Sequence, residues 1–456
     1  MRDVVVIVGA GFSGTVLAAN LLRRTAGEPL HIVLVERAPQ MNRGVAYAER
    51  DFPYLLNVPA GRLSADSTDA QQFLKFARAG LPQVGPEDFL TRSLYGDYLE
   101  DLLKRAESEA GPHVRFERVR DEVLDLEPAA GATAVRFAAH PPLRANSVVL
   151  AVGNPPASTL RWLEPLRDNA AVRENPWELP EDVHAHQSVL IVGNGLTMAD
   201  VVLKLSSDAA HVPTFHTISR RGLLPQVQTA FHASAACGSP EVMLAAADSI
   251  RSLFRAGRKL TRDVERAGGD WREAVTFIRS LAPQIWAKLP HHERARFLRH
   301  VQAQWNTHRH RLPLPVAQRL GELKSAGRLN VNAGRVLRVT EQGTRLRVDW
   351  LRRGEHDPRS LTVDLIVNAT GPDYVLARTR EPLLRSLQAK GLITADALGL
   401  GLRTDGLGAC LDARGEPSAN IYYLGPMLRA DHWEATAALE LRDHAERLAL
   451  RLSKGW

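Results

Sequence analysis

Three glycines near the start of the chain are spaced as a phosphate-binding turn requires. Gly9, Gly11 and Gly14 lie in the run "VVVIVGAGFSG", after apolar residues that favour a strand buried on both faces. The first glycine permits a tight turn, the second lets the backbone approach a pyrophosphate, and the third lets a helix pack against the strand. The pyrophosphate would lie on the free N–H groups at the start of that helix.

An acidic residue ends the next predicted strand. The run "HIVLVER" carries Glu36 about 20 residues after the glycines, where an acid binds a ribose diol. Strand, glycine turn, helix, strand and acid in this order predict a dinucleotide site. The alternative is a tight strand-to-helix turn that binds no ligand.

The same pattern begins again in the run "SVLIVGNGLTMAD", residues 188–200. Gly193 and Gly195 supply the turn and the close approach, and Thr197 follows on the predicted helix. Met198 occupies the place of the third glycine. A bulky side chain there is expected to hold the helix further from the strand, so this loop binds its nucleotide loosely or has lost it.

Two arginines stand where the first unit has its acid. The strand "VPTFHTIS" is followed by Arg220 and Arg221. An acid at this position selects the ribose of NAD or FAD, whereas an arginine accommodates a 2′-phosphate. The guanidinium fork donates two parallel charged hydrogen bonds, which suits phosphate. The pattern therefore predicts an NADPH site in the second unit. The alternative is that both arginines are only solvated.

Composition places the chain among ordinary water-soluble proteins. Its 456 residues predict about three domains or subdomains. No apolar run reaches the roughly 18 residues of a membrane span, and the start lacks a signal-peptide layout, so a cytoplasmic protein is expected. The net charge of +7 comes from arginines scattered among acids, which predicts no nucleic-acid partner. Cys237 and Cys410 form no Cys-x-x-Cys, which argues against a disulfide reductase; both are expected to be buried small hydrophobes.

The pattern turns helical over residues 226–330. One face of "ERARFLRHVQAQW" carries Phe297, Leu298, Val301 and Trp305. A helical segment inserted beyond a dinucleotide-binding unit would cover a substrate cavity. The alternatives are a packed helical cap or a subunit interface. The run "HRHR", residues 308–311, lacks the spacing of a zinc site and is expected to be a basic, solvated or anion-facing patch, so no metal is predicted.

At this point the chain resembles the FAD/NAD(P)-binding proteins of bacterial genomes that are related to flavin-dependent monooxygenases. The resemblance covers nearly the whole chain and rests on segments such as "GAGFSG", "LLNVPAGRLSAD", "RSLYGDYL", "GNGLTMAD", "ISRRGLLP", "NATGP" and "LGPMLRADHWEATAALELR". One departure is that the Phe-x-Gly-x-x-x-His fingerprint of Baeyer–Villiger and amine-oxygenating relatives is absent before Gly193, where "WELPEDVHAHQ" stands.

The resemblance implies an α/β fold with two Rossmann-like dinucleotide-binding domains, a discontinuous FAD domain and a helical insert. The strands before Gly153 and Gly371, each followed by proline, would be the crossings between domains. The FAD domain would then comprise 1–160 and 361–456, and the NAD(P)H domain 161–225 and 331–360, with the insert at 226–330. A helix starting around 434–436 would direct its N-terminus toward the negative pyrimidine edge of a reduced flavin.

The resemblance also implies FAD as prosthetic group and NADPH as reductant. "LLNVP" is similar to the segment that sets an asparagine beside the flavin in N-oxygenating relatives, which makes Asn57 the one catalytic candidate. The full set of candidate cofactor-binding residues is Gly9, Gly11, Phe12, Ser13, Gly14, Glu36, Arg37, Gly44, Asn57, Val123, Gly153, Gly193, Gly195, Thr197, Arg220, Arg221, Gly371, Gly425, Trp433 and Thr436.

Three functions are compatible with these features. The first is an NADPH-dependent flavin monooxygenase that acts on a small molecule with O2, without a membrane partner. The second is a flavin dehydrogenase or oxidase that inserts no oxygen. The third is a non-catalytic nucleotide-binding protein in which Met198 marks an inactive NADPH site. The substrate and the oligomeric state are not specified by the sequence.

Overall fold

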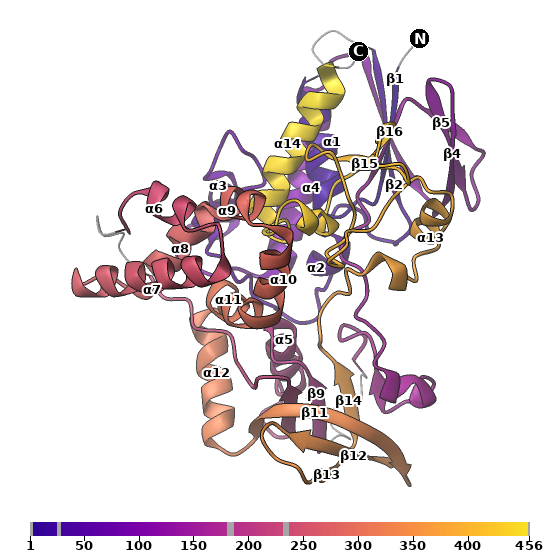
Figure 1. Cartoon of the computed structure of the whole chain (residues 1–456). Helices are drawn as coiled ribbons and strands as arrows, with labels where there is room; N and C mark the ends of the chain where they lie inside the picture. The colour runs from indigo at the N-terminus through magenta and orange to yellow at the C-terminus, as the bar shows by residue number, and fades with distance from the viewer. Residues whose placement is uncertain (1–2, 25–28, 180–186, 231–236, 455–456) are drawn as a thin grey trace. The chain divides into compact units, whose positions relative to one another are not determined.

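The computed structural model describes residues 3–24, 29–179, 187–230 and 237–454 (Figure 1). The chain divides into two compact units. Unit 1 comprises Met1–Pro155 and Tyr374–Trp456, and unit 2 comprises Pro156–Asp373. Each unit has its own sheet, and the two are described separately below.

Unit 1 is built on a six-stranded sheet in the order β15-β16-β7-β1-β2-β3. The strands are β1 (Asp3–Val8), β2 (Leu30–Glu36), β3 (Val114–Arg120), β7 (Ser147–Leu150), β15 (Ala409–Leu411) and β16 (Pro417–Tyr423). All neighbouring pairs are parallel except β15 and β16. The strands β2 and β3 lie on one side of β1, and the later strands β7, β16 and β15 lie on the other side. The strand order therefore reverses between β1 and β7.

Alternate residues of the unit 1 strands point to opposite faces, and both faces are covered. Val5 and Ile7 of β1 pack with α1 (Phe12–Arg24), α4 (Arg92–Glu109) and α14 (Ala438–Lys454), which lie together in Figure 1. Val6 and Val8 pack on the other side with α13 (Pro382–Ala389) and the small antiparallel sheet β4 (Val123–Ala129), β5 (Ala132–Phe137) and β6 (Leu143–Ala145). Strands covered on both faces are expected to be apolar throughout, as "VVVIV" is.

The remaining short elements of unit 1 join these layers. They are α2 (Gly44–Tyr47), η1 (Ala60–Arg62), α3 (Gln72–Gly80), η5 (Leu376–Arg378) and η6 (Pro426–Ala430).

Unit 2 repeats the parallel core of unit 1 and extends it by a meander. Its sheet has the order β13-β12-β11-β10-β9-β14-β8. The strands β9 (Ser188–Val192), β10 (Thr214–Ser219), β14 (Leu365–Asn368) and β8 (Val172–Arg173) are parallel, whereas β11 (Leu329–Gln342), β12 (Arg345–Arg352) and β13 (Arg359–Val363) form an antiparallel meander. β9 lies between β10 and β14 as β1 lies between β2 and β7.

Helices dominate residues 226–330, as the sequence predicts. Besides η2 (Arg161–Leu166) and α5 (Leu196–Leu205), unit 2 contains α6 (Pro240–Ala245), α7 (Ile250–Arg266), α8 (Trp271–Ser280), α9 (Ala282–Lys288), α10 (His291–His300), α11 (Gln302–Arg309) and α12 (Leu314–Ser325). One detail differs from the predicted pattern. The backbone turns at Val301, which ends α10 and precedes α11, so Phe297 and Trp305 lie on separate helices.

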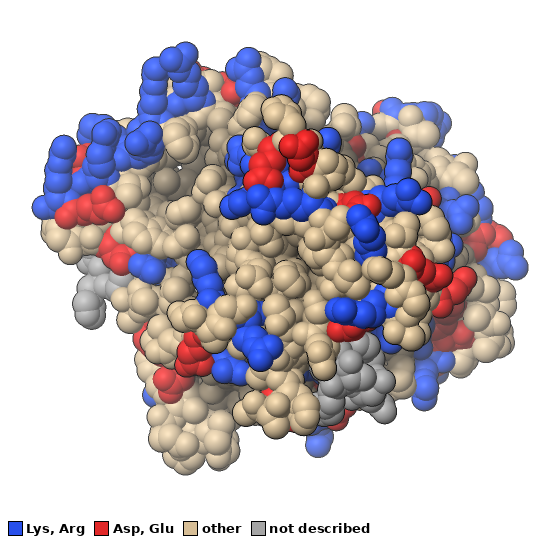
Figure 2. All heavy atoms as spheres, turned by 90° about the horizontal axis from the view of Figure 1, so that it is seen from below, with Lys and Arg blue, Asp and Glu red and all other residues tan. Residues whose placement is uncertain are grey.

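Basic residues gather on α7. All six of its lysines and arginines are exposed, and blue side chains cluster at the upper left of Figure 2, over the region of α7, while elsewhere on that face they alternate with acids. The scatter of arginines expected from the sequence therefore has this local exception. Within the described residues, no helix is both long enough and apolar enough to span a membrane.

Candidate functional site

The first glycine loop is held tightly against the neighbouring strands. The Gly9 N–H donates to the Val35 carbonyl at 2.8 Å, and the Ala151 N–H donates to the Val8 carbonyl at 2.8 Å. A side chain at Gly9 would place its Cβ 2.4 Å from the Ala151 oxygen, and one at Gly14 would lie 1.9 Å from the Gly9 oxygen. Both distances are far below van der Waals contact, so these two positions accept glycine alone.

Two of the candidate glycines of unit 1, Gly11 and Gly44, contact each other. Gly44 has a positive φ of 57°, and a Cβ built there would be 3.1 Å from the Cα of Gly11. Phe12 and Ser13 follow in the first turn of α1, with Ser13 buried and Phe12 partly buried. Gly44 thus lies directly behind the glycine loop, at the N-terminus of α1.

Both oxygens of Glu36 accept backbone hydrogen bonds, and one of these bonds comes from the glycine loop. Oε2 accepts a hydrogen bond from the Ala10 N–H at 2.8 Å, and Oε1 accepts one from the Ala38 N–H at 2.9 Å. A carboxylate has about four acceptor positions, so two remain for a diol. Arg37, in contrast, forms ion pairs with Glu122 and Glu381 that tie the end of β2 to the start of α13.

The candidate residues beyond the loop differ in what they offer to a ligand. The side chain of Val123 is buried in the core beneath β4, so only its backbone is available. Gly153, which follows β7, has a φ of 73° and open space around it. Gly371 follows β14 in unit 2 with a φ of 83° and equally open surroundings.

The second glycine loop has the same backbone contacts as the first. The Gly193 N–H donates to the Ile218 carbonyl at 2.9 Å, and a Cβ at Gly193 would lie 2.3 Å from the Ala369 oxygen. Gly195 is exposed at the start of α5, and Thr197 is partly buried in its first turn. Met198 is fully buried, so its side chain is part of the core of unit 2 rather than an obstruction at the surface of the loop.

Asn194 was not identified from the sequence. It lies between the two glycines of the second loop, where the first loop has Ala10. Its side chain is buried, and neither amide atom has a hydrogen-bond partner within the described residues. An unpaired buried amide costs about 1–3 kcal/mol, so this position is not explained by packing alone.

The two arginines after β10 have different surroundings. Arg221 donates from Nη1 to the His300 carbonyl at 3.1 Å and from Nη2 to the Arg299 carbonyl at 2.9 Å. It therefore caps the last turn of α10, whose carbonyls lack partners within the helix. Arg220 is exposed, and no hydrogen bond or ion pair within the described residues holds its side chain. Only Arg220 is thus free to meet a phosphate.

Asn57 lies on a segment that is anchored on both sides. The Leu56 N–H donates to the Leu90 carbonyl at 2.8 Å, and the Ala60 N–H donates to the Asp88 carbonyl at 2.9 Å. Asn57 itself is partly exposed. The other end of the segment is fixed by a buried carboxylate, Asp66.

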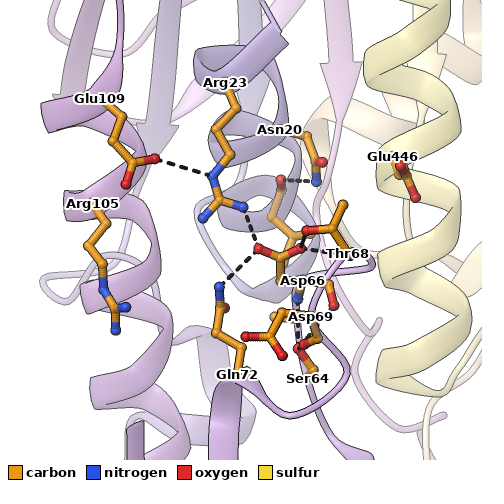
Figure 3. Close-up of polar contacts among 12 residues, drawn as sticks. Asn20, Arg23, Ser64, Asp66, Thr68, Asp69, Gln72, Arg105, Glu109 and Glu446 are labelled. Carbon is orange, nitrogen blue, oxygen red and sulfur yellow. Dashed lines mark hydrogen bonds and ion pairs between the residues drawn. The ribbon is translucent and has the colours of Figure 1, made fainter. Parts of the chain in front are cut away.

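Figure 3 shows how Asp66 ties this segment to α1 and α3. Arg23 of α1 donates to Asp66 Oδ2 at 2.7 Å, and Gln72 of α3 donates to the same oxygen at 2.9 Å. Thr68 donates to Oδ1 through its N–H at 2.8 Å and its hydroxyl at 2.6 Å. Burial by itself would raise the pKa of Asp66, but the Thr68 hydrogen bonds and the Arg23 charge outweigh it and lower the pKa.

The C-terminal candidates lie between β16 and α14. Gly425 follows β16 and is packed under the Tyr423 ring, whose hydroxyl would be 2.8 Å from an added Cβ. Trp433 is buried and Thr436 is partly buried. The expected helix start at 434–436 is wrong by a few residues. Residues 433–436 form turns, and α14 begins at Ala438, where the first helical bonds close.

Two other sequence-based expectations need correction. Arg311 of the "HRHR" run is buried rather than solvated: it donates to Gln228 Oε1 at 2.9 Å and lies over the Trp271 ring. Cys410 is buried as expected, but Cys237 is only partly buried, and its thiol donates to Glu273 at 3.4 Å. In the ranges that the structure describes, no group of three or more His, Cys, Asp or Glu side chains could hold a metal ion. Residues 180–186 of "WELPEDVHAHQ" lie outside the described residues.

A family model and solved structures agree with this geometry. Residues 6–155 match the model of an FAD-NAD(P)-binding family. None of the curated proteins is similar to the chain in sequence.

Three solved enzymes share the architecture over the whole chain. The ornithine N-hydroxylase of Kutzneria sp. 744, solved with reduced FAD, NADP+ and L-ornithine, is 17% identical with a TM-score of 0.64, and the match covers 100% of both chains. The L-lysine 6-monooxygenase of Pseudomonas syringae is 18% identical with a TM-score of 0.66, covering 100% of this chain and 99% of that one. The cadaverine monooxygenase of Erwinia amylovora, solved with FAD, is 14% identical with a TM-score of 0.67, covering 100% and 95%. The chain therefore has the two-dinucleotide-domain flavoprotein fold.

Proposed function

We propose that this protein is an NADPH-dependent flavin monooxygenase that oxygenates a small molecule. The observation that carries the proposal is the pairing of two glycine loops with the same backbone and opposite charges at the following strand end, Glu36 in unit 1 and Arg220 in unit 2. An acid there suits the ribose of FAD, and an arginine suits the 2′-phosphate of NADPH.

The residues of unit 1 fit FAD. Gly9 and Gly14 hold the turn, and Gly11 precedes the N-terminus of α1, whose free N–H groups suit a pyrophosphate. Glu36 keeps acceptor positions for a ribose diol after binding Ala10 and Ala38. Gly153 offers open space at the end of β7, the strand next to the point where the strand order reverses. We assign the FAD domain to unit 1 on these grounds.

The residues of unit 2 fit NADPH through one arginine rather than two. Arg220 is exposed at the tip of β10, whereas the guanidinium of Arg221 is used in capping α10. Gly193 and Gly195 repeat the phosphate-binding turn, and Met198 does not intrude into it because its side chain is buried in the core. We therefore assign NADPH binding to unit 2.

The chemistry of the reaction would come from the cofactors. FAD, when bound, accepts a hydride from NADPH and activates O2 for transfer to the substrate. The task of this chain is then to bind, to orient and to exclude water, so few acid–base residues are required. We propose Asn57 as a hydrogen-bonding group for the cofactor or the substrate, because its segment is anchored on both sides.

An amine is the favoured substrate class. The three solved enzymes with this architecture are named for ornithine, lysine and cadaverine, which are small amines. Purified protein should contain FAD and should consume NADPH faster when its amine is added, with one oxygenated product formed per NADPH.

The substrate class is tested by measuring NADPH consumption and oxygenated product with a panel of small amines, amino acids and carbonyl compounds. Peroxide formed in equal amount to the NADPH consumed, with no oxygenated product from any of them, would favour the oxidase alternative. A flavoprotein that never oxidises NADPH would eliminate both enzymatic functions and leave the non-catalytic one.

A further inference from the structure

Arg429 lies at the carboxyl edge of the unit 1 sheet. It belongs to η6, which follows β16 and Gly425. β16 pairs with β7, and β7 pairs with β1, where the order of the strands reverses. Ligands of open α/β sheets bind outside the carboxyl ends of the strands at such a reversal. A dinucleotide held by the first glycine loop would therefore extend along the edge that carries Arg429.

Two aromatic rings flank this guanidinium. Its central carbon is 4.2 Å from the ring centre of Trp433 and 4.9 Å from that of Tyr374. The Tyr374 hydroxyl donates to Asn154 Oδ1 at 3.1 Å, and Asn154 directly follows Gly153 at the end of β7. The arginine and its rings thus connect the loop after β7 with the loop after β16, the two loops that carry the candidates Gly153 and Gly425.

The guanidinium of Arg429 is partly buried and shares a hydrogen bond with the Tyr374 side chain. Its Nε is buried without a hydrogen-bond partner, and no carboxylate within the described residues forms an ion pair with it. Burial lowers the pKa of Arg429, although Tyr374 and the nearby Glu434 act in the opposite direction.

Arg43, a deeply buried arginine of unit 1, shows how a purely structural arginine is satisfied. Arg43 is only 2% exposed and pairs with both Asp97 and Glu100, with a further hydrogen bond to the Ser93 carbonyl at 3.1 Å. Arg429 has no such set of acids. An anion from outside the chain would complete its environment.

We propose that Arg429 stabilises the negative charge that FAD acquires on reduction. This inference rests on the proposed function. Transfer of a hydride oxidises NADPH to NADP+ and gives the flavin two electrons and one proton, so the reduced cofactor carries one more negative charge. A guanidinium held at the carboxyl edge favours that form over the oxidised one. Arg429 thereby raises the reduction potential of the bound FAD.

The test is the potential of the FAD-loaded protein, measured by equilibration with a reference dye without any substrate. Arg429→Met should lower the potential; a tenfold loss in the preference for the reduced form corresponds to about 30 mV. Arg429→Lys keeps the charge and should retain most of the potential. Arg414→Met is the matched control because it removes the same charge from a side chain that is 84% exposed.

The outcomes separate this inference from the proposed function. An unchanged potential in Arg429→Met, or an equal fall in Arg414→Met, overturns the role of Arg429. An arginine that bound only a substrate anion would leave the potential unchanged in Arg429→Met. If Arg429→Met does not fold or loses FAD, Arg429→Gln and Arg429→Lys are compared instead, and equal potentials in these two overturn it. Wild-type protein that contains no FAD would refute the proposed function itself.

Discussion

The two glycine loops of this chain share a backbone and differ in their side chains. In unit 1, the N–H of Gly9 and that of Ala151 bind the neighbouring strands at 2.8 Å each. In unit 2, the N–H of Gly193 and that of Ala369 make the corresponding bonds at 2.9 Å each. The turn is therefore set by the pairing of three parallel strands, and it is the same whichever nucleotide is bound.

The differences lie at the third position and at the following strand end. Gly14 touches the Gly9 carbonyl so closely that any side chain would collide with it, yet Met198 fits into the core at the equivalent place. The first-turn bond is 3.0 Å from Thr15 to Gly11 but 3.4 Å from Ala199 to Gly195, so the second helix starts more loosely. The lesson is that strand pairing sets the same backbone in both loops, while the side chains around the two loops differ.

The largest expected effect comes from filling the space that only glycine fits. Gly14→Ala places a methyl group 1.9 Å from a carbonyl oxygen and should destabilise the protein by more than about 3 kcal/mol, with loss of FAD. Gly195→Ala, where a Cβ meets nothing within 4 Å, is the control and should keep its FAD. Flavin content and denaturant unfolding measure both. Normal FAD content in Gly14→Ala would mean that the close packing of this loop is not needed for the cofactor.

Removal of the methionine tests the same position in unit 2. Met198→Ala opens a cavity in the core and should cost about 2–5 kcal/mol of the free energy of unfolding. Met198→Leu, which nearly conserves volume, should cost less than about 1.5 kcal/mol. Equilibrium unfolding compares the two variants. If Met198→Ala leaves the free energy of unfolding nearly unchanged, the packing role of Met198 is contradicted, and its side chain would lie at the surface of the loop.

The arginines at the strand end give a smaller but more specific effect. Arg220→Ala should weaken NADPH binding by about 10–100-fold and leave NADH nearly unchanged, because only NADPH carries the 2′-phosphate. Arg221→Ala should affect both nucleotides alike, since this side chain caps α10. Titration of each variant with the two nucleotides checks this. An equal loss of NADPH and NADH in Arg220→Ala would be inconsistent with a phosphate contact.

The smallest expected effect is a pH dependence that belongs to unit 1. The pKa of Asp66 is lower in the folded protein than its usual value near 3.9, so its contribution to stability is present above that pH and is lost as the pH falls through the folded pKa. Asp66→Asn should therefore flatten the decline in unfolding free energy below about pH 4. Parallel curves for the two proteins would show that Asp66 is not the group responsible.

Local pattern was enough to predict most of the fold but only part of the site. The strands, the glycine turns and the position of Glu36 at the end of β2 could be predicted because each is fixed by short-range sequence. The different uses of Arg220 and Arg221 could not, because Arg221 bonds carbonyls of residues 299 and 300. Arg429 was missed for the same reason: Tyr374 is far from it in sequence, and only the spacing to Trp433 within "MLRADHW" was visible.

An anaerobic titration of the purified protein with NADPH, followed at the flavin absorbance, tests the central claim most directly. If unit 1 holds FAD and unit 2 presents NADPH, the absorbance of oxidised flavin should disappear with one NADPH per flavin. NADH should need a concentration about 10–100-fold higher, by the same 2′-phosphate contact. Protein that binds FAD but keeps its oxidised spectrum at saturating NADPH would contradict the account.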